Sequence, residues 1–268
     1  MWVAAIQLNS TPNQVANLAR AQTLVEEAAS RGAQLVALPE HFACLGSDAD
    51  TAAAAQPLDG PLVTSFRELA AKLRIFLLLG SFPERSPGKA RPYNTSLLLA
   101  PQGKIIAHYR KLHLFDVDLP GPPPLRESEH TQPGEAVVTV ALPGTSFTAG
   151  LAICYDLRFP ELFRTQVSQG ANLILMPAAF TATTGRDHWE VLLRARAIEN
   201  LAYVVAPAQF GQHVPGRRSY GRSLIVDPWG TLLAQAPDGE GVILAELDYE
   251  RLQRLRRELP ALRHRRLH

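Results

Sequence analysis

Cysteine is nearly absent from this chain of 268 residues, which contains only Cys44 and Cys154. The two lie far apart and belong to no CxxC or Cys/His pattern, so the sequence indicates neither a disulfide framework nor a zinc site. Both are therefore expected to be free thiols in a reducing compartment, and one of them can be present for its chemical reactivity.

Long apolar runs and nucleotide-binding motifs are also missing. No stretch approaches the ~20 apolar residues that span a membrane, and the N-terminus turns polar at Gln7 without the basic and apolar regions of a signal peptide. There is no GxGxxG or Walker pattern. The net charge of +2, from 27 basic and 25 acidic residues, gives no overall field that would attract nucleic acid. We therefore expect a cytoplasmic protein that binds neither membranes nor nucleic acids.

The residues that are present predict a folded α/β protein, since 46% are hydrophobic and 19% charged. Short apolar runs alternate with longer amphipathic segments, which predicts strands alternating with helices on both faces of the sheets. No linker-like change of composition divides the chain, so we expect a single domain over residues 1–268. The expected strands are 3–8, 34–38, 75–80, 93–100, 104–108, 147–153, 172–176, 202–208, 223–226 and 242–247, and the expected helices are 13–31, 62–74, 160–169, 187–200 and one that begins at 249.

Two segments depart from this alternation. Residues 116–134 hold five prolines and little periodicity, and they are expected to form a long ordered loop. Residues 249–268 are rich in arginine and are expected to form a basic C-terminal helix and tail. A solvated helix face, with the tail docked on the body or on a second subunit, is favoured over an arm that binds an anionic partner.

Three chemically reactive side chains follow directly on apolar strands: Glu40, Lys111 and Cys154. Side chains at such positions can converge at one edge of a sheet, where a thiol, a carboxylate and an amine together form a nucleophile with a base and an oxyanion donor. Taken singly, a glutamate after a strand is usually a helix cap or a surface group, and a cysteine is usually a small buried hydrophobe. Lys111 is a somewhat better catalytic candidate when taken alone. The chain has 23 arginines and only four lysines, so a lysine here suggests that a compact amine with an adjustable pKa is needed.

The surrounding sequences resemble the three catalytic blocks of the nitrilase superfamily. These blocks are residues 38–40, 109–116 and 153–162, and the resemblance continues almost to the end of the chain through residues 177–181, 188–200, 219–221 and 226–230. Within the superfamily the chain is similar to the Nit branch of amidases, and inside that branch it resembles deaminated glutathione amidases more than omega-amidases.

The resemblance implies a four-layer αββα sandwich of the nitrilase type, a Glu-Lys-Cys site, and neither a metal nor another cofactor. Carried over residue by residue, Cys154 is the nucleophile, Glu40 the general base and Lys111 the oxyanion stabiliser. The supporting or substrate-binding residues implied in the same way are Glu127, Tyr155 (through its backbone N–H), Arg158, Phe180 and Thr181.

The implied reaction is hydrolysis of a linear amide of a small carboxylate-bearing substrate, with deaminated glutathione as a candidate and ammonia as a product. A free thiol has a pKa of about 8.5, so it needs a base or a nearby positive charge to attack at neutral pH. An omega-amidase, a nitrilase, an N-carbamoyl amino acid amidohydrolase or an acyltransferase would use the same triad through the same thioester. The expected partners are the small-molecule amide and a second copy of the chain, as a homodimer or a higher homo-oligomer.

Three further interpretations stay open at this point. His113 or His188 could form a Cys-His dyad with Cys154, although that would leave Glu40 and Lys111 unexplained. A non-catalytic interaction protein on an amidase scaffold would require a degraded triad. Arg222 stands where the Nit branch usually has histidine, and it either enters the pocket and alters the choice of substrate or faces solvent.

Overall fold

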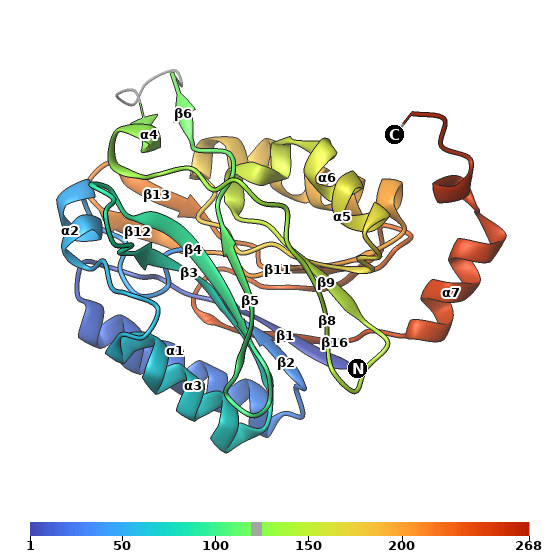
Figure 1. Ribbon diagram of the computed structural model, residues 1–268, viewed down its shortest axis with the longest axis horizontal. Helices are drawn as coiled ribbons and strands as arrows, with labels where there is room; N and C mark the ends of the chain where they lie inside the picture. The colour runs from blue at the N-terminus through green and yellow to red at the C-terminus, as the bar shows by residue number, and fades with distance from the viewer. Residues whose placement is uncertain (119–124, 268) are drawn as a thin grey trace.

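Two six-stranded β-sheets pack face to face between two layers of helices (Figure 1). The computed structural model describes residues 1–118 and 125–267. This architecture is the αββα sandwich that the resemblance implied, and the fold prediction is therefore confirmed. The prediction of a single domain from residue 1 to 268 stays a prediction.

The first sheet has the strand order β16-β1-β2-β3-β4-β5. Strands β1, β2 and β3 are parallel, β3, β4 and β5 form an antiparallel meander, and β16 pairs antiparallel with β1. The bounds are β1 (Trp2–Gln7), β2 (Leu35–Ala37), β3 (Phe76–Glu84), β4 (Tyr93–Leu99), β5 (Ile105–Arg110) and β16 (Gly241–Glu246). Helices α1 (Gln14–Ser30) and α3 (Pro61–Leu73) cover its outer face, and α2 (Asp48–Ala53) lies between them in sequence.

The second sheet has the order β15-β14-β11-β10-β9-β8, with β9, β10 and β11 parallel. Its strands are β8 (Thr139–Ala141), β9 (Thr148–Leu151), β10 (Leu173–Leu175), β11 (Tyr203–Ala206), β14 (Leu224–Val226) and β15 (Leu232–Gln235). Helices α5 (Pro160–Ser168) and α6 (Ala182–Asn200) cover it. The remaining elements are β6 (Asp116–Val117), β7 (Leu125–Arg126), α4 (Glu127–His130), η1 (Cys154–Arg158), β12 (Phe210–Val214), β13 (Arg217–Tyr220), α7 (Tyr249–Glu258) and η2 (Ala261–Arg263).

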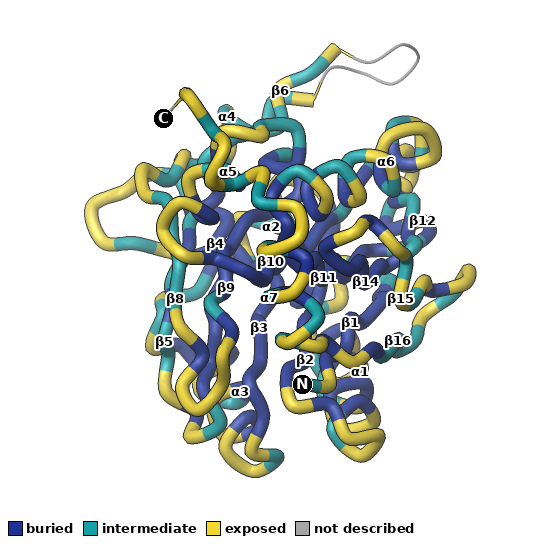
Figure 2. Tube along the Cα trace, turned by 90° about the vertical axis from the view of Figure 1, so that its right-hand side faces the viewer, coloured by how far each residue is buried: buried dark blue, intermediate teal, exposed yellow. Residues whose placement is uncertain are grey.

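The central strands are buried on both faces, as Figure 2 shows. In β1, Val3 and Ala5 face the core between the two sheets, whereas Ala4 and Ile6 pack under α1 and α3. Burial on both faces explains why these strands appear in the sequence as continuous apolar runs. It also explains why the polar residues that follow the strands are conspicuous.

The main elements lie where the sequence predicts them, with differences at their edges. Helix α6 begins five residues earlier than predicted, because Thr181 caps its first turn. Gly185 is a poor helix former, but it lies inside the helix, where the absence of a side chain lets the backbone lie directly against Tyr220 of β13. The short strands β8, β12, β13 and β15 were not predicted. The expected long loop contains β6, β7 and α4, and its residues 119–124 lie outside the described part of the chain.

No helix within residues 1–118 and 125–267 combines the length and the apolar character that crossing a membrane would require.

Replacing Glu84 with glutamine is expected to lower the free energy of unfolding by on the order of 3 kcal/mol at pH 7, because it breaks a buried ion pair. Glu84 is 2% exposed, and its carboxylate accepts hydrogen bonds from Thr95 (2.6 Å) and from Arg110 (2.9 and 2.5 Å), with a ring nitrogen of His108 at 3.0 Å. Burial alone would raise its pKa, but these partners outweigh burial and lower the pKa from 4.5 to about 2.

The stabilisation by Glu84 is therefore fully present above about pH 4.5 and is lost as the pH falls toward 2. Urea titrations of the two proteins should show a gap at pH 7 that closes at low pH. Glu27→Gln is the matched control, because its pair with Arg31 is 46% exposed on both sides and should contribute less than about 0.5 kcal/mol. A gap that does not change with pH would contradict this account.

Candidate active site

Glu40, Lys111 and Cys154 meet at one place in the folded chain. Glu40 follows β2 and Lys111 follows β5 of the first sheet, whereas Cys154 follows β9 of the second. The Lys111 Nζ donates a hydrogen bond to Glu40 Oε1 at 3.1 Å. All three residues are buried: Glu40 is 2% exposed, Lys111 2% and Cys154 8%. The structure thus brings together the three residues that the strand ends singled out.

Glu40 is held as a buried anion. Its Oε1 accepts hydrogen bonds from Lys111 and from Asn94 Nδ2 at 2.9 Å, and its Oε2 accepts one from the backbone N–H of Ala179 at 2.8 Å. Burial alone would raise the pKa of this carboxyl, but the positive charge of Lys111 and the hydrogen bonds lower it to about 2. At neutral pH the group is an ionised carboxylate and can accept a proton.

Lys111 is held between two carboxylates. Besides Glu40, its ammonium donates to Glu127 Oε2 at 2.8 Å, and the same oxygen accepts the backbone N–H of Phe115 at 2.7 Å. Burial opposes the charged form of the amine, but the negative charges of Glu127 and Glu40 prevail and raise the pKa of Lys111 well above its ordinary value. A protonated amine in this position can stabilise negative charge that develops beside it.

Cys154 occupies a strained turn at the start of η1. Its φ of 49° lies in the left-handed region, which costs a residue other than glycine about 1–3 kcal/mol, and its backbone N–H donates to Pro177 O at 2.9 Å. Burial and the negative charge of Glu40 raise the pKa of the thiol well above its ordinary value, although Lys111 partly opposes them. The thiol is therefore neutral at pH 7 and lies beside a carboxylate that can take its proton during attack.

Asn94 is a site residue that the sequence analysis missed. Its amide nitrogen donates to Glu40 at 2.9 Å and to Glu127 at 3.3 Å, and its backbone oxygen accepts the N–H of Lys111. It thus supports both carboxylates that hold the lysine. Asparagine is depleted in strands, so its presence as the second residue of β4 was the available signal.

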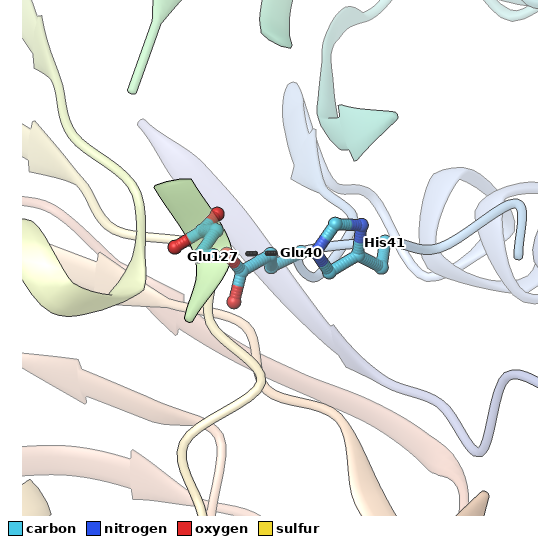
Figure 3. A group of neighbouring side chains, drawn as sticks. All are labelled: Glu40, His41 and Glu127. Carbon is cyan, nitrogen blue, oxygen red and sulfur yellow. Dashed lines mark ion pairs between the residues drawn. The ribbon is translucent and has the colours of Figure 1, made fainter. Parts of the chain in front are cut away.

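Glu40, His41 and Glu127 form a group whose ligand atoms lie within 4.8 Å of one another, the arrangement that a metal ion would need (Figure 3). One feature of this group argues against a metal. The Lys111 ammonium lies 3.1 Å from Glu40 Oε1 and 2.8 Å from Glu127 Oε2, so the two carboxylates already hold a cation. The site fits an amine better than a metal.

Two of the expected substrate-contact residues, Phe180 and Tyr155, lie near the guanidinium of Arg158. This group lies 5.3 Å from the centre of the Phe180 ring and 6.0 Å from that of Tyr155. Its nitrogens approach His188 Nδ1 at 3.3 Å, and no carboxylate of the described residues forms an ion pair with it. The hydroxyl of Thr181 caps α6 through Thr184, so its contact with the substrate stays a prediction.

The histidine alternatives lose support. His113 Nδ1 lies 2.7 Å from Asp156 Oδ1, and the His113 ring stacks on Phe159 at 3.7 Å. His188 contacts Arg158 instead. The charges that shift the pKa of Cys154 come from Glu40 and Lys111, so a Cys-His dyad is not the arrangement that the fold builds.

Arg222 does not enter this site. Its guanidinium pairs with Asp238 at 2.8 Å, and the Asp238 side chain is 71% exposed. Its backbone oxygen accepts a hydrogen bond from the indole of Trp189. Of the two interpretations that the sequence left open, a side chain that faces solvent is therefore the one that the structure supports.

Comparison with known proteins places these features in a family. The family model described as carbon-nitrogen hydrolase matches residues 2–257. The chain belongs to the carbon-nitrogen hydrolase family. A deaminated glutathione amidase from Synechocystis sp. is 43% identical to it over 98% of this chain and 97% of the relative. The crystal structure of Nit3 from Saccharomyces cerevisiae, a member of branch 10 of the nitrilase superfamily, superposes with a TM-score of 0.90 at 36% identity, over 100% of this chain and 97% of Nit3.

A more distant family member bears on the role of the thiol. In a glutamate-to-glutamine mutant of an amidase from Nesterenkonia sp. AN1, acrylamide has added to the active-site cysteine. That structure superposes with a TM-score of 0.80 at 27% identity, over 97% of this chain and 98% of the amidase. The prediction of a cysteine-dependent hydrolase that acts on amide carbon–nitrogen bonds is confirmed, as is the similarity to deaminated glutathione amidases.

Proposed function

We propose that this carbon-nitrogen hydrolase releases ammonia from the linear amide of a small carboxylate-bearing substrate of the deaminated glutathione type. Cys154 is the nucleophile, Glu40 the general base and Lys111 the oxyanion stabiliser. The observation that carries the proposal is the buried Lys111 ammonium, held between Glu40 and Glu127 beside the Cys154 thiol.

In the first half of the reaction the thiol gives its proton to Glu40 while its sulfur bonds to the amide carbon. The negative charge on the carbonyl oxygen is stabilised by Lys111 and by the backbone N–H of Tyr155. When the carbon–nitrogen bond breaks, the protonated Glu40 returns the proton to the leaving nitrogen. Ammonia departs, and the acyl group remains on Cys154 as a thioester.

In the second half Glu40 removes a proton from a water molecule, which attacks the thioester carbon. The carbon–sulfur bond then breaks, and the proton on Glu40 returns to the sulfur of Cys154. The product is the carboxylic acid, and the enzyme is restored. The pKa of about 2 keeps Glu40 ionised at physiological pH, which is the form that a general base requires, although it also makes the resting carboxylate a weak base.

The proposal is tested by measuring ammonia release from deaminated glutathione, 2-oxoglutaramate and simple neutral amides, with the Cys154→Ala protein as background. Aliphatic nitriles and N-carbamoyl amino acids are measured in parallel, and hydroxylamine is added to detect acyl transfer. We expect the highest kcat/KM for an amide that bears carboxylates. A higher value for a nitrile or a carbamoyl compound would refute the substrate class, and no release above background from any amide would refute the activity.

Arg158 is the side chain proposed to bind a substrate carboxylate. Replacing it with glutamine is expected to raise KM for carboxylate-bearing amides by about 10- to 100-fold, because hydrogen bonds to charged groups contribute about 1.5–3 kcal/mol. The KM for neutral amides and kcat should stay near the wild-type values. Steady-state kinetics on one amide of each class checks this, with Arg254→Gln on α7, an exposed arginine, as the control. An equal rise in KM for both classes would remove Arg158 from substrate selection.

The cytoplasmic location and the homodimer or higher homo-oligomer belong to this proposal as well. Sedimentation of the purified protein at micromolar concentration tests the second of them.

A further inference from the structure

The carboxylate of Asp156, two residues after Cys154, joins the two segments that carry the reactive groups. It is fully buried and accepts four hydrogen bonds, two on each oxygen. None of the mechanistic steps uses this group. A buried anion with so many donors is costly to desolvate, and it therefore calls for an explanation.

One oxygen of Asp156 accepts a hydrogen bond from the segment that carries Cys154. Its Oδ2 accepts the backbone N–H of Ile153 at 2.8 Å, and Ile153 directly precedes Cys154. The same oxygen accepts the hydroxyl of Tyr109 at 2.6 Å, and that hydroxyl in turn accepts the backbone N–H of Leu112 at 3.3 Å. Tyr109 and Leu112 lie on either side of Lys111 in the sequence.

The other oxygen accepts a hydrogen bond from the segment that carries Lys111. Asp156 Oδ1 accepts the backbone N–H of His113 at 3.1 Å, with His113 Nδ1 at 2.7 Å. The imidazole stacks in parallel on Phe159, five residues beyond Cys154. Residues on both sides of Lys111 and on both sides of Cys154 are thus tied to one carboxylate.

We propose that Asp156 is a positioning residue that fixes the separation between the Cys154 sulfur and the Lys111 ammonium. Lys111 follows a strand of the first sheet and Cys154 follows a strand of the second, so hydrogen bonds within the sheets do not fix the distance between the two side chains. Cys154 also sits in a strained left-handed turn that only surrounding contacts can maintain. Misplacing reacting groups by about 1 Å can cost on the order of 100-fold in rate. This inference rests on the proposed catalytic roles of Cys154 and Lys111.

Asp156→Asn is the informative variant, because each oxygen of Asp156 accepts one backbone N–H, and an amide can replace only one oxygen. Either Ile153 or His113 must then lose its acceptor. We expect kcat to fall by about 10- to 100-fold with KM little changed, and Cys154 to react more slowly with iodoacetamide than in the wild type. The split between kcat and KM distinguishes misplaced catalytic groups from a damaged substrate pocket.

Asp227→Asn is the matched control. Asp227 is 1% exposed, its Oδ1 accepts the backbone N–H groups of Trp229 and Thr231, and its Oδ2 pairs with Arg251 at 2.7 Å. It is an equally buried carboxylate with a purely structural environment. We expect this variant to lower Tm while leaving kcat and the rate of alkylation unchanged. If both variants lower kcat in proportion to their loss of Tm, Asp156 is only structural and the inference is wrong.

A second pair of variants applies if Asp156→Asn does not fold. His113→Asn keeps an N–H donor near the position of Nδ1, whereas His113→Leu removes it, and the side chain is 31% exposed so that both changes are tolerable. We expect the leucine variant to lose more kcat than the asparagine variant at equal Tm, and equal kcat values would overturn the inference. The outcome is separable from the proposed function: an active Cys154→Ala protein refutes that function, whereas an inactive one leaves the positioning role to be decided by these variants.

Discussion

Replacing Cys154 with alanine is expected to lower kcat for amide hydrolysis by at least about 10⁵-fold, because loss of the nucleophile removes the whole covalent pathway. The fold should survive. The exchange deletes one sulfur atom from a side chain that is 8% exposed, and alanine meets the same backbone strain at a φ of 49°. A coupled ammonia assay and a thermal melt on the same preparation check both parts.

Cys44→Ala is the control for this prediction, because Cys44 is the other buried thiol and lies only 1% exposed. Its sulfur approaches the backbone oxygens of Pro12 and Asp50 rather than a base. We expect it to keep the wild-type kcat and to form the acyl adduct that mass spectrometry detects in wild-type protein during turnover. Activity that follows Cys44 rather than Cys154 would overturn the assignment of the nucleophile.

The position of the reactive residues could be predicted because the sequence marks where strands end. Glu40, Lys111 and Cys154 each follow an apolar run, and the carboxyl ends of strands that run in the same direction lie at the same edge of a sheet. The surrounding blocks added the family and, with it, the roles that we propose for the three side chains. Periodicity alone would have given only the strands and helices.

The support of the site could not be predicted in this way, because it depends on contacts between distant segments. Asn94 reaches the two glutamates only through the register of β4 against β5, which one strand's sequence does not encode. The positioning role proposed for Asp156 depends on its hydrogen bonds with Tyr109 and His113, which lie in and directly after β5 of the other sheet. The direction of Arg222 is decided by Asp238, which lies 16 positions further along the chain.

Replacing Lys111 with methionine is expected to lower kcat by at least about 10³-fold, which exceeds the loss of a single oxyanion donor. Without the ammonium, the Glu40 and Glu127 carboxylates, both of which contact it, would lie close together with no cation between them. Two adjacent carboxylates cannot both ionise easily, so the pKa of one of them should rise strongly. If Glu40 takes up that proton, the general base is lost together with the oxyanion stabiliser.

The same substitution should change how stability depends on pH. In the wild type the depressed pKa of Glu40 contributes stability above about pH 4.5, which is lost as the pH falls toward 2. In Lys111→Met the raised carboxyl pKa acts in the opposite sense, because its contribution is lost as the pH rises through that value. Breaking the buried pair should cost about 3–5 kcal/mol at pH 7 and less at pH 5, where one carboxyl is protonated.

Urea titrations at pH 5 and pH 7, combined with steady-state kinetics, separate this account from a general loss of structure. Lys72→Met is the matched control, since Lys72 pairs with Glu26 at a similar distance of 2.9 Å while both side chains are at least 47% exposed. We expect that variant to change the free energy of unfolding by less than about 1 kcal/mol and to keep the wild-type kcat. A Lys111→Met protein whose destabilisation is the same at both pH values would show that the two carboxylates do not share a proton. The ammonium would then act on the oxyanion alone.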